Sequence, residues 1–266
     1  MQNIEYVRQG LEKVRSGSPL VLSVTNYVAA NLNANGLLAV GASPIMTHQA
    51  EEIEDLVSIA GAVVCNMGIP AGTLPEALYR AGECANRLGK ILVFDPVGAG
   101  ASEYRNRVCR KLLSCASPDI IRGNASEIIA LAGQSGATRG VDSTHGSLEA
   151  RDAATALATK YGCTVCVSGE TDLVTDGNRE ILIVNGHEMM PRITGLGCTA
   201  SALAGAFAAV MDDTVEAVTA CMAVLGIAGE LAAETAAGPA SLQTGIIDTL
   251  FTLSGEEIAE RARISS

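Results

Sequence analysis

The feature that most constrains the fold of this 266-residue chain is a regular alternation of two hydrophobic patterns. Short apolar runs with the composition of buried strands recur along the first two thirds of the sequence. They are Leu20–Val24, Ala62–Asn66, Ile91–Phe94, Ile120–Ile121, Cys163–Val167 and Ile181–Val184. Between most of them lie segments with apolar residues three and four positions apart: Glu51–Ala60, Leu74–Leu88, Arg105–Cys115, Ala125–Ala132 and Leu148–Tyr161. This alternation predicts an α/β fold with a central, mostly parallel sheet flanked by helices.

The pattern changes after Gly186, where helical segments follow one another with no strand between them. They are Gly197–Met211, Thr214–Glu234 and Pro239–Leu253. We therefore expect a C-terminal helical layer. Just before this change, Asp176-Gly177-Asn178 separates two apolar runs, and Asp-Gly suits a tight turn with positive φ, so we predict an antiparallel hairpin at the sheet edge. No repeat or linker divides residues 1–266, which we expect to form a single domain.

Charge and cysteine usage limit the partners of the chain. The net charge is −11 and no run of Lys or Arg interrupts it, so a nucleic-acid backbone would be repelled. The eight cysteines are scattered, and the start of the chain lacks a basic and then apolar signal sequence, which favours free thiols and a cytoplasmic location. The longest apolar stretches, Ala200–Met211 and Ala217–Gly229, are too short for a membrane span. We expect neither nucleic acid nor a membrane as a partner.

Polar residues stand at the ends of several predicted strands, where open α/β sheets bind their ligands. Asn26 follows the first strand, Asp95 the third, Arg122 the fourth and Ser168 the fifth. Asp95 begins the segment Asp-Pro-Val-Gly-Ala-Gly, in which a carboxylate precedes two glycines that let the backbone approach a phosphate. A metal or phosphate site and a simple capped turn both fit this segment taken alone.

A second polar segment, Arg-Gly-Asn-Ala-Ser-Glu, runs from Arg122 to Glu127. Asn124 and Glu127 have the spacing of a capping box, so helix capping alone explains both residues. It does not explain Arg122, which stands at the end of an apolar strand in a protein with few positive charges. We expect the guanidinium of Arg122 to neutralise phosphate.

A third candidate, Gly195-Leu196-Gly197-Cys198, precedes a helix of small residues. The free amides and the dipole at the start of that helix predict an anion site, although a helix that merely begins at glycines also fits. Gly195–Ala200 matches G-x-G-x-x-A, but a dinucleotide-binding turn requires a following strand ending in Asp or Glu, and here another helix follows. At a helix N-terminus we expect a lowered pKa for the Cys198 thiol, which leaves it as nucleophile, weak base, positioning group or inert packing.

Zinc and P-loop chemistry have little support in the sequence. Cys163-x-x-Cys166 resembles a fragment of a zinc or redox motif, but an offset of three in a strand sends the two side chains to opposite faces. His48, His145 and His187 are far apart and lack the spacing of zinc ligands. A metal, if used, is expected to be Mg²⁺ on carboxylates and nucleotide phosphates. The motif G-x-x-x-x-G-K-[ST] does not occur.

Six blocks in order resemble the hydroxyethylthiazole kinase family, a branch of the ribokinase-like kinases. They are Thr25-Asn26, Ala34-Asn35-Gly36-Leu37-Leu38-Ala39, Gly41-Ala42-Ser43-Pro44-Ile45-Met46, Asp95-Pro96-Val97-Gly98-Ala99-Gly100, Ile121-Arg122-Gly123-Asn124-Ala125-Ser126-Glu127 and Gly195-Leu196-Gly197-Cys198. The similarity covers most of the chain, from Ser18 to Ser241. Any one block is a weak signal, whereas six in the right order are a strong one.

The resemblance implies a three-layer ribokinase-like fold, ATP as phosphoryl donor, Mg²⁺ as cofactor and a homotrimer with thiazole sites between subunits. The reaction it implies is phosphorylation of the hydroxyl of 4-methyl-5-(2-hydroxyethyl)thiazole, in thiazole salvage for thiamine synthesis. The site residues it implies are Asn26, Met46 and Gly195 for substrate, Arg122, Ser168 and Gly197 for ATP and its phosphates, Asp95 and Glu127 for the metal, and Cys198 as the catalytic residue facing the substrate hydroxyl.

The sequence departs from the family pattern in a few places. Ser168 stands where Thr is usual, which keeps the hydroxyl group. Met67-Gly68-Ile69-Pro70 replaces a more polar segment, and Tyr27 stands where smaller or polar residues are common. These differences bear on substrate preference and not on the reaction.

Three other functions stay open at this stage: a ribokinase-like kinase for another heterocyclic alcohol, such as hydroxymethylpyrimidine or pyridoxal; a non-catalytic nucleotide-binding protein; and a transferase with Cys198 as nucleophile. The wider ribokinase-like group usually carries Asp at the Cys198 position, so Cys there argues against the first. The presence of both Asp95 and Glu127 argues against the second. We hypothesise that the amides of Gly195, Gly197 and Cys198 hold the transferring phosphate while Cys198 orients the hydroxyl.

Overall fold

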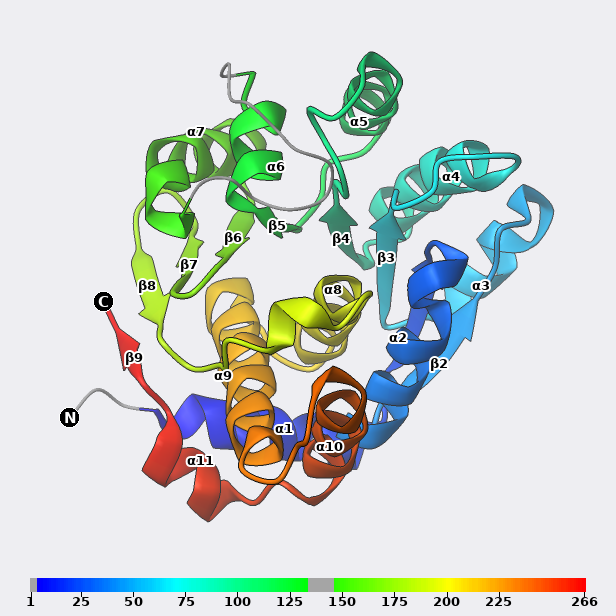
Figure 1. Ribbon diagram of the computed structural model, residues 1–266. Coiled ribbons are helices and arrows are strands. Elements are labelled where there is room, and N and C mark those ends of the chain that lie inside the picture. The colour runs from blue at the N-terminus through cyan, green and yellow to red at the C-terminus, as the bar shows by residue number, and fades with distance from the viewer. Residues whose placement is uncertain (1–3, 134–145) are drawn as a thin grey trace.

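The computed structural model describes residues 4–133 and 146–266, in which helices cover both faces of one sheet (Figure 1). His145 lies outside the described residues. The sheet has the strand order β2-β1-β3-β4-β5-β6-β7-β8-β9. Its strands are β1 Leu20–Val24, β2 Ser43–Met46, β3 Ala62–Asn66, β4 Ile91–Asp95, β5 Ile120–Asn124, β6 Thr164–Ser168, β7 Asp172–Thr175, β8 Glu180–Ile183 and β9 Ile264–Ser265. Neighbours from β2 to β6 pair in parallel, and β7, β8 and β9 add antiparallel pairs at one edge.

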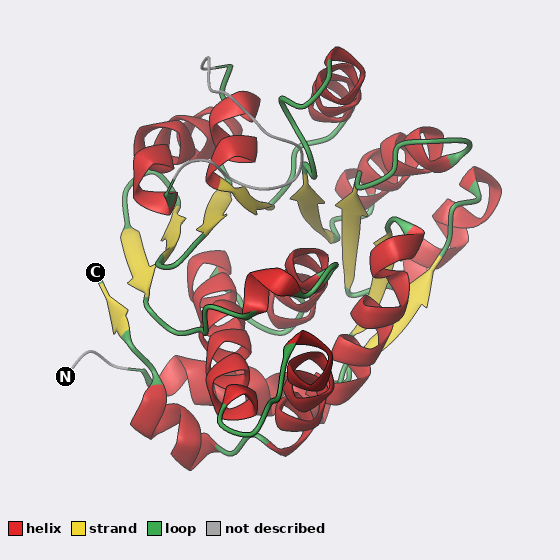
Figure 2. Ribbon diagram, in the orientation of Figure 1, coloured by secondary structure: helices red, strands yellow, loops and turns green. Residues whose placement is uncertain are grey.

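The helices divide between the two faces of the sheet, and Figure 2 distinguishes them from the strands by colour. They are α1 Glu5–Gly17, α2 Tyr27–Val40, α3 Ile53–Ile59, α4 Leu74–Arg87, α5 Glu103–Cys115, α6 Ala125–Leu131, α7 Arg151–Tyr161, α8 Leu196–Ala208, α9 Thr214–Ala233, α10 Pro239–Thr252 and α11 Gly255–Arg261, with short 3₁₀ turns η1 Ala50–Glu52, η2 Ser147–Ala150 and η3 Met190–Arg192. Helices α3 to α7 share cores with one face of the sheet. The N-terminal helices α1 and α2 join α8 to α11 on the other.

Small residues let the C-terminal helices lie close to the sheet. A side chain at Gly205 of α8 would bring its Cβ within 3.1 Å of Val64 on β3, so the helix backbone approaches the strand closely. Helix α9 is long and apolar enough for a membrane span by length and composition, but 83% of that apolar window is buried inside the protein, as in a core helix. Most residues of α8 and α9 are buried, and α8 packs against β3 and β4 at the centre of the sheet.

The mostly parallel sheet and the hairpin agree with the sequence-based expectation, and the differences lie mainly at the ends of elements. Strand β5 continues to Asn124 because its last residues pair with β6, which places Arg122 inside a strand. The segment expected as one helix over residues 148–161 is divided into η2 and α7. The chain does not end with its helical layer, because β9 returns to pair antiparallel with β8. Helices α1, α2 and α11 and strand β2 were not singled out in the sequence.

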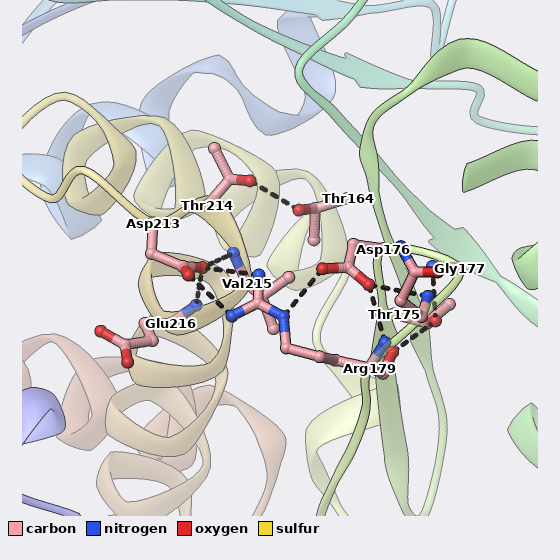
Figure 3. A network of polar contacts seen from close by, with 10 residues as sticks. Thr164, Thr175, Asp176, Gly177, Arg179, Asp213, Thr214, Val215 and Glu216 are labelled. Carbon is pink, nitrogen blue, oxygen red and sulfur yellow. Dashed lines mark hydrogen bonds and ion pairs between the residues drawn. The ribbon is translucent and has the colours of Figure 1, made fainter. Parts of the chain in front are cut away.

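The hairpin β7–β8 is anchored to the start of α9 by a polar network of its own (Figure 3). Gly177 has the expected positive φ of 93°. Arg179 lies between two carboxylates, with its Nε 2.8 Å from Asp176 and its Nη1 2.7 Å from Asp213. Asp213 also caps α9 by accepting hydrogen bonds from the amides of Val215 and Glu216. This network fixes the antiparallel edge to the helical layer.

Candidate active site

The carboxyl ends of the parallel strands bring most of the candidate residues to one edge of the sheet. Asp95 is the last residue of β4 and is paired in register with Asn66, the last residue of β3. Ser168 ends β6 and is paired in register with Asn124 at the end of β5. Asn26 lies just beyond β1 and caps α2 by accepting a hydrogen bond from the Ala29 amide. The edge therefore collects polar groups from five strand ends.

Asp95 is buried and serves as more than a turn cap. Its Oδ2 atom accepts hydrogen bonds from Asn66 Nδ2 and from Ser201 Oγ of α8, both at 2.7 Å. Burial raises the pKa of Asp95, and the positive charge of Arg122 opposes that shift. The capped-turn alternative is disfavoured, because the carboxylate accepts from side chains of a neighbouring strand and of a helix distant in sequence.

Glu127 forms the capping box of α6 that the sequence predicts, and it also binds the turn after β4. Its Oε2 atom accepts from the Asn124 amide at 2.8 Å, and Asn124 Oδ1 accepts from the Glu127 amide at 2.9 Å. Its Oε1 atom accepts from the Gly98 amide at 2.7 Å, where Gly98 has a φ of 71°. Burial and the nearby charge of Asp95 raise the pKa of Glu127 to about 7. Capping therefore explains only part of what this carboxylate does.

Arg122 points from β5 toward the start of α8 and is 8% exposed. Its Nη1 atom donates to the carbonyl of Gly197 at 3.0 Å, while its Nε has no hydrogen-bond partner among the described residues. Burial works against its charge, but Asp95, the next largest influence, raises the pKa of the guanidinium above its ordinary value. The described ion pairs within 4.0 Å include none to Arg122. Buried polar groups are normally hydrogen-bonded, so an unpartnered Nε marks spare donor capacity.

The start of α8 supplies further donors beside Arg122. Gly195 takes a φ of 88° at the N-cap, a conformation that favours glycine, and so turns the chain into the helix. A Cβ on Gly197 would lie 2.9 Å from Arg122 Nη1, so the guanidinium in its present position packs directly against this turn. The amides of Gly197 and Cys198 donate to no other group in residues 4–133 and 146–266. Together with Arg122 they form an anion-binding constellation.

Cys198 lies in the first turn of α8, where Asn26 Nδ2 contacts its sulfur at 3.7 Å. The expected lowering of its thiol pKa is wrong. Burial, followed by the charge of Asp95, raises that pKa to about 12, although the amides of Asn66 and Asn26 act in the opposite direction. Desolvation of a thiolate outweighs the helix terminus here. The thiol is therefore neutral near pH 7.

Two candidate residues lie apart from this cluster. Met46 ends β2, the edge strand, and three strand spacings of about 4.8 Å separate β2 from β4. Ser168 lies at the same edge of the sheet as Asp95, two strands away, and its hydroxyl contacts the carbonyl of Gly123 at 3.4 Å. Cys163 and Cys166 pack in different cores on opposite faces, as the strand periodicity predicts.

Sequence reasoning missed Asn66 and Ser201, which both bind the Asp95 carboxylate. Asn66 ends a predicted strand in the same way as Asp95, so the rule of looking at strand ends points to it as well. Ser201 carried no such signal, because a serine within an apolar helix is common and only the packing of α8 on the sheet brings it to β4.

The fold and the site define the class. A ribokinase-like superfamily protein from Enterococcus faecalis superposes with a TM-score of 0.69 at 12% identity over 96% of this chain and 95% of its own. An ADP complex of Bacillus subtilis pyridoxal kinase gives 0.63 at 16% identity over 80% of this chain and 92% of its own. At these identities the likeness shows the fold alone, and the fold is that of the ribokinase-like kinases.

Closer relatives then identify the family. The model of the hydroxyethylthiazole kinase family matches residues 11–256. Hydroxyethylthiazole kinase from Nitratidesulfovibrio vulgaris is 47% identical over 99% of both chains, and that from Syntrophus aciditrophicus is 52% identical over 96% of this chain and 94% of its own. The solved hydroxyethylthiazole kinase from Pyrococcus horikoshii has a TM-score of 0.91 at 39% identity over 98% of both chains. The chain belongs to the hydroxyethylthiazole kinase family.

Proposed function

We propose that this protein transfers the γ-phosphoryl group of ATP to the hydroxyl of 4-methyl-5-(2-hydroxyethyl)thiazole, as in thiazole salvage for thiamine synthesis. The observation that carries the proposal is the buried Arg122, whose Nε has no hydrogen-bond partner among the described residues and whose Nη1 lies at the start of α8, in a chain that belongs to this family. An alcohol acceptor, an anion site and two buried carboxylates are what phosphoryl transfer by positioning and charge neutralisation requires.

On the donor side, Arg122 and the amides of Gly197 and Cys198 hold the transferring phosphate. A guanidinium in a dry site binds a phosphate more strongly than one in water, because competing solvent is excluded. Ser168, at the end of β6, binds the nucleotide further along the same edge. Gly195 belongs to the substrate side, since its turn brings the first residues of α8 against α2.

Asp95 and Glu127 fit Mg²⁺ that arrives with the nucleotide. Both are oxygen ligands of the kind Mg²⁺ prefers. Burial and then the charge of Asp95 raise the pKa of Glu127, and a divalent cation would stabilise the charged form of both carboxylates. No group of three or more His, Cys, Asp or Glu side chains among the described residues forms a metal cage. A nucleotide-borne Mg²⁺ supplies charge neutralisation at the transferring phosphoryl group.

On the acceptor side, Cys198 is the catalytic residue and Asn26 a substrate contact. With a thiol pKa of about 12, Cys198 is a poor proton acceptor at neutral pH, so it orients the acceptor hydroxyl. Phosphoryl transfer tolerates a weak base when the reacting groups are held in line. This assignment separates Cys198 from a thiolate nucleophile, which would require a much lower pKa.

A homotrimer with sites between subunits accounts for the position of Met46. The residue ends the edge strand β2, away from Arg122 and Asp95, so a second copy is needed to enclose a thiazole there. Large apolar side chains lie exposed on α2 and α10, which border this edge: Tyr27 64%, Val28 56%, Leu38 59% and Phe251 71%. Mass measurement in solution tests the trimer directly, and a monomer that turns over the thiazole normally would contradict it.

Two further assignments complete the proposal. A cytoplasmic location is supported by all eight cysteines being free, most of them buried, since an oxidising compartment favours disulfides. Residues 1–266 work as one kinase domain, because the described strands form one continuous sheet and both helical layers pack on it.

The test is a substrate panel. The protein is incubated with Mg·ATP and hydroxyethyl or hydroxymethyl heterocycles, including the thiazole, hydroxymethylpyrimidine and pyridoxal, and both ADP and phosphorylated alcohol are measured. We expect the thiazole to give the highest kcat/KM. Turnover confined to another alcohol would show a kinase of different specificity, and absence of turnover with every alcohol would leave only nucleotide binding.

A further inference from the structure

Asn66 joins the carboxylate side of the proposed site to its acceptor side. It is fully buried at the end of β3. Its Nδ2 atom donates to Asp95 Oδ2 at 2.7 Å, and its Oδ1 atom accepts from Asn26 Nδ2 at 2.8 Å and from the Gly68 amide at 3.0 Å. Asn26 Nδ2 in turn contacts Cys198 Sγ at 3.7 Å. The hydrogen bonds run unbroken from Asp95 to Cys198.

The direction of each hydrogen bond in this chain is fixed by chemistry. The Oδ1 atom of Asn26 accepts from the Ala29 amide at the start of α2, so its NH₂ group must face Asn66. The Gly68 amide can only donate, so Oδ1 of Asn66 must face it and the NH₂ group of Asn66 must face Asp95. With both ends fixed, neither amide can flip without leaving a buried polar group unpaired, which is costly.

The geometry points to Asn66 as a positioning residue that sets the distance between the acceptor hydroxyl and the phosphoryl group, and we propose this role on the basis of the proposed kinase function. Cys198 and Asn26 orient the alcohol, while Asp95 stands on the phosphate and metal side. In-line transfer needs the reacting atoms about 3–3.5 Å apart, and a shift of about 1 Å costs about 10²-fold in rate. Asn66 holds the two sides at a constant separation through its rigid amide.

The close fit of Gly68 over Asn26 supports the same role. A Cβ built on Gly68 would lie only 2.2 Å from Asn26 Nδ2, the closest approach to any glycine of the described chain. Gly68 does not have a positive φ, so its backbone conformation suits alanine and only this contact excludes a side chain. Substituting Gly68 therefore displaces the Asn26 amide without removing a functional group.

The experiment compares Asn66→Ala with the wild type, and with Val64→Ala as a matched control. Val64 is also fully buried, two residues earlier on β3 and on the same face, so its truncation weakens packing without touching the hydrogen bonds. For each protein, ADP and phosphorylated alcohol are measured separately, together with KM for ATP and unfolding in urea. The alcohol is the one that the wild type phosphorylates best.

We expect Asn66→Ala to lower the rate of alcohol phosphorylation about 10²-fold, with KM for ATP changed less than about threefold. Asp95 loses one donor but keeps its hydrogen bond from Ser201, whereas the acceptor hydroxyl is misplaced. ADP formed by hydrolysis should therefore exceed phosphorylated alcohol, a ratio that simple destabilisation does not change. Val64→Ala should lose stability but keep the two products equal. Retained turnover in Asn66→Ala, or an equal fall of both products, overturns the role of Asn66.

Gly68→Ala gives a second measurement that keeps every polar side chain. It should reproduce the excess of ADP, and combined with Asn66→Ala it should lose little more than the larger single effect, since both act through the Asn26 amide. Gly17→Ala is its control, because a Cβ there meets Val210 at an ordinary 3.5 Å. Equal products in Gly68→Ala would overturn the link. If the wild type is inactive on the thiazole, the proposed substrate is wrong. The ratio of ADP to phosphorylated alcohol can still be measured with the alcohol that the wild type does phosphorylate.

Discussion

Two arginines in this protein stand near acidic residues, and the contrast between them separates a structural network from the candidate site. Arg179 is half exposed and bonds both its carboxylates directly, at 2.8 and 2.7 Å (Figure 3). Arg122 is buried, makes none of the described ion pairs, and donates to a carbonyl with its Nε left over. The exposed arginine is satisfied within the protein. The buried one keeps capacity for another anion.

The carboxylates follow the same division. Hydrogen bonds from Arg179 and the Asn178 amide overcome burial and lower the pKa of Asp176 to about 2. At the carboxyl edge, burial raises the pKa of Glu127 to about 7 and that of Asp172 to about 7. A carboxyl group whose pKa is lowered stabilises the fold in its charged form. A buried carboxyl group whose pKa is raised costs stability when it is ionised, unless a cation neutralises it.

The largest effect is expected from substituting Arg122, and its absence would contradict the contrast between the two arginines. Arg122→Met should lower kcat/KM about 10³-fold, because the transferring phosphate loses its charged donor. Arg122→Lys should recover only part of the loss, since a point charge lacks the fork of a guanidinium. Steady-state kinetics on proteins shown to be folded by circular dichroism measure the effect.

Arg179→Met is the matched control for that measurement. Its ion pairs are exposed and far from the carboxyl edge, so its kinetic constants should remain within about twofold of the wild type. A similar kinetic loss in both variants would show that the two arginines differ in burial alone and not in function.

The next effect concerns pH and compares two aspartates of the same hairpin. The folded pKa of Asp172 is about 7, above its ordinary 3.8, so between these values the folded state binds the extra proton. Its contribution to stability is therefore present at low pH and lost as pH rises toward 7. Asp172→Asn can still accept from the Gly169 amide and should remove this decline. The unfolding free energy of the variant minus that of the wild type should be greater at pH 8 than at pH 4 by on the order of 2–4 kcal/mol.

Asp176 should behave with the opposite sign. Its folded pKa of about 2 lies below 3.8, so its contribution is present above pH 3.8 and lost as pH falls toward 2. Urea unfolding of Asp172→Asn and Asp176→Asn across pH 2–8 checks both slopes. Parallel pH curves for the two variants would contradict the division between buried and exposed carboxylates.

This contrast also explains which parts of the molecule the sequence could predict. Strand runs such as Ile91–Phe94 and the capping box at Asn124 and Glu127 are local patterns, and the structure contains both. The strand-end rule pointed to Asp95, which does end β4, and to Arg122, which lies two residues before the end of β5. The approach of Ser201 to Asp95 depends on how α8 lies on the sheet, which local sequence does not encode.

The error at Cys198 has the same origin. A position in the first turn of a helix predicts a lowered thiol pKa, but the pKa depends on how deeply the surrounding chain buries the sulfur and on the distant residue Asp95. These are properties of the assembled site. The family resemblance supplied roles such as that of Met46, for which neither local pattern nor the described contacts give a physical account.

A smaller effect on turnover is expected from substituting Cys198. Cys198→Ala should reduce turnover about tenfold while leaving ATP binding nearly intact, because the residue contacts the acceptor side. Since the thiol pKa is about 12, the pH dependence of kcat between pH 6 and 9 should keep its shape in the variant. Kinetics and calorimetric titration with Mg·ATP measure both. Loss of ATP binding would overturn the assignment, and a covalent adduct in the wild type would instead indicate a nucleophile.

The smallest effect is expected at the exposed network, where one residue allows capping and ion pairing to be separated. Asp213 accepts from the amides of Val215 and Glu216 through Oδ1, and it binds Arg179 through Oδ2 at 2.7 Å and more weakly through Oδ1 at 3.3 Å. Asp213→Asn keeps an oxygen for the cap and loses the charge, so it should cost less than about 0.5 kcal/mol, and that cost should shrink in salt. Asp213→Ala loses the cap as well and should cost about 1 kcal/mol more. Equal losses in the two variants would mean that the cap contributes little beside the ion pair, so that Asp213 would stabilise the hairpin through its charge and not as a helix cap.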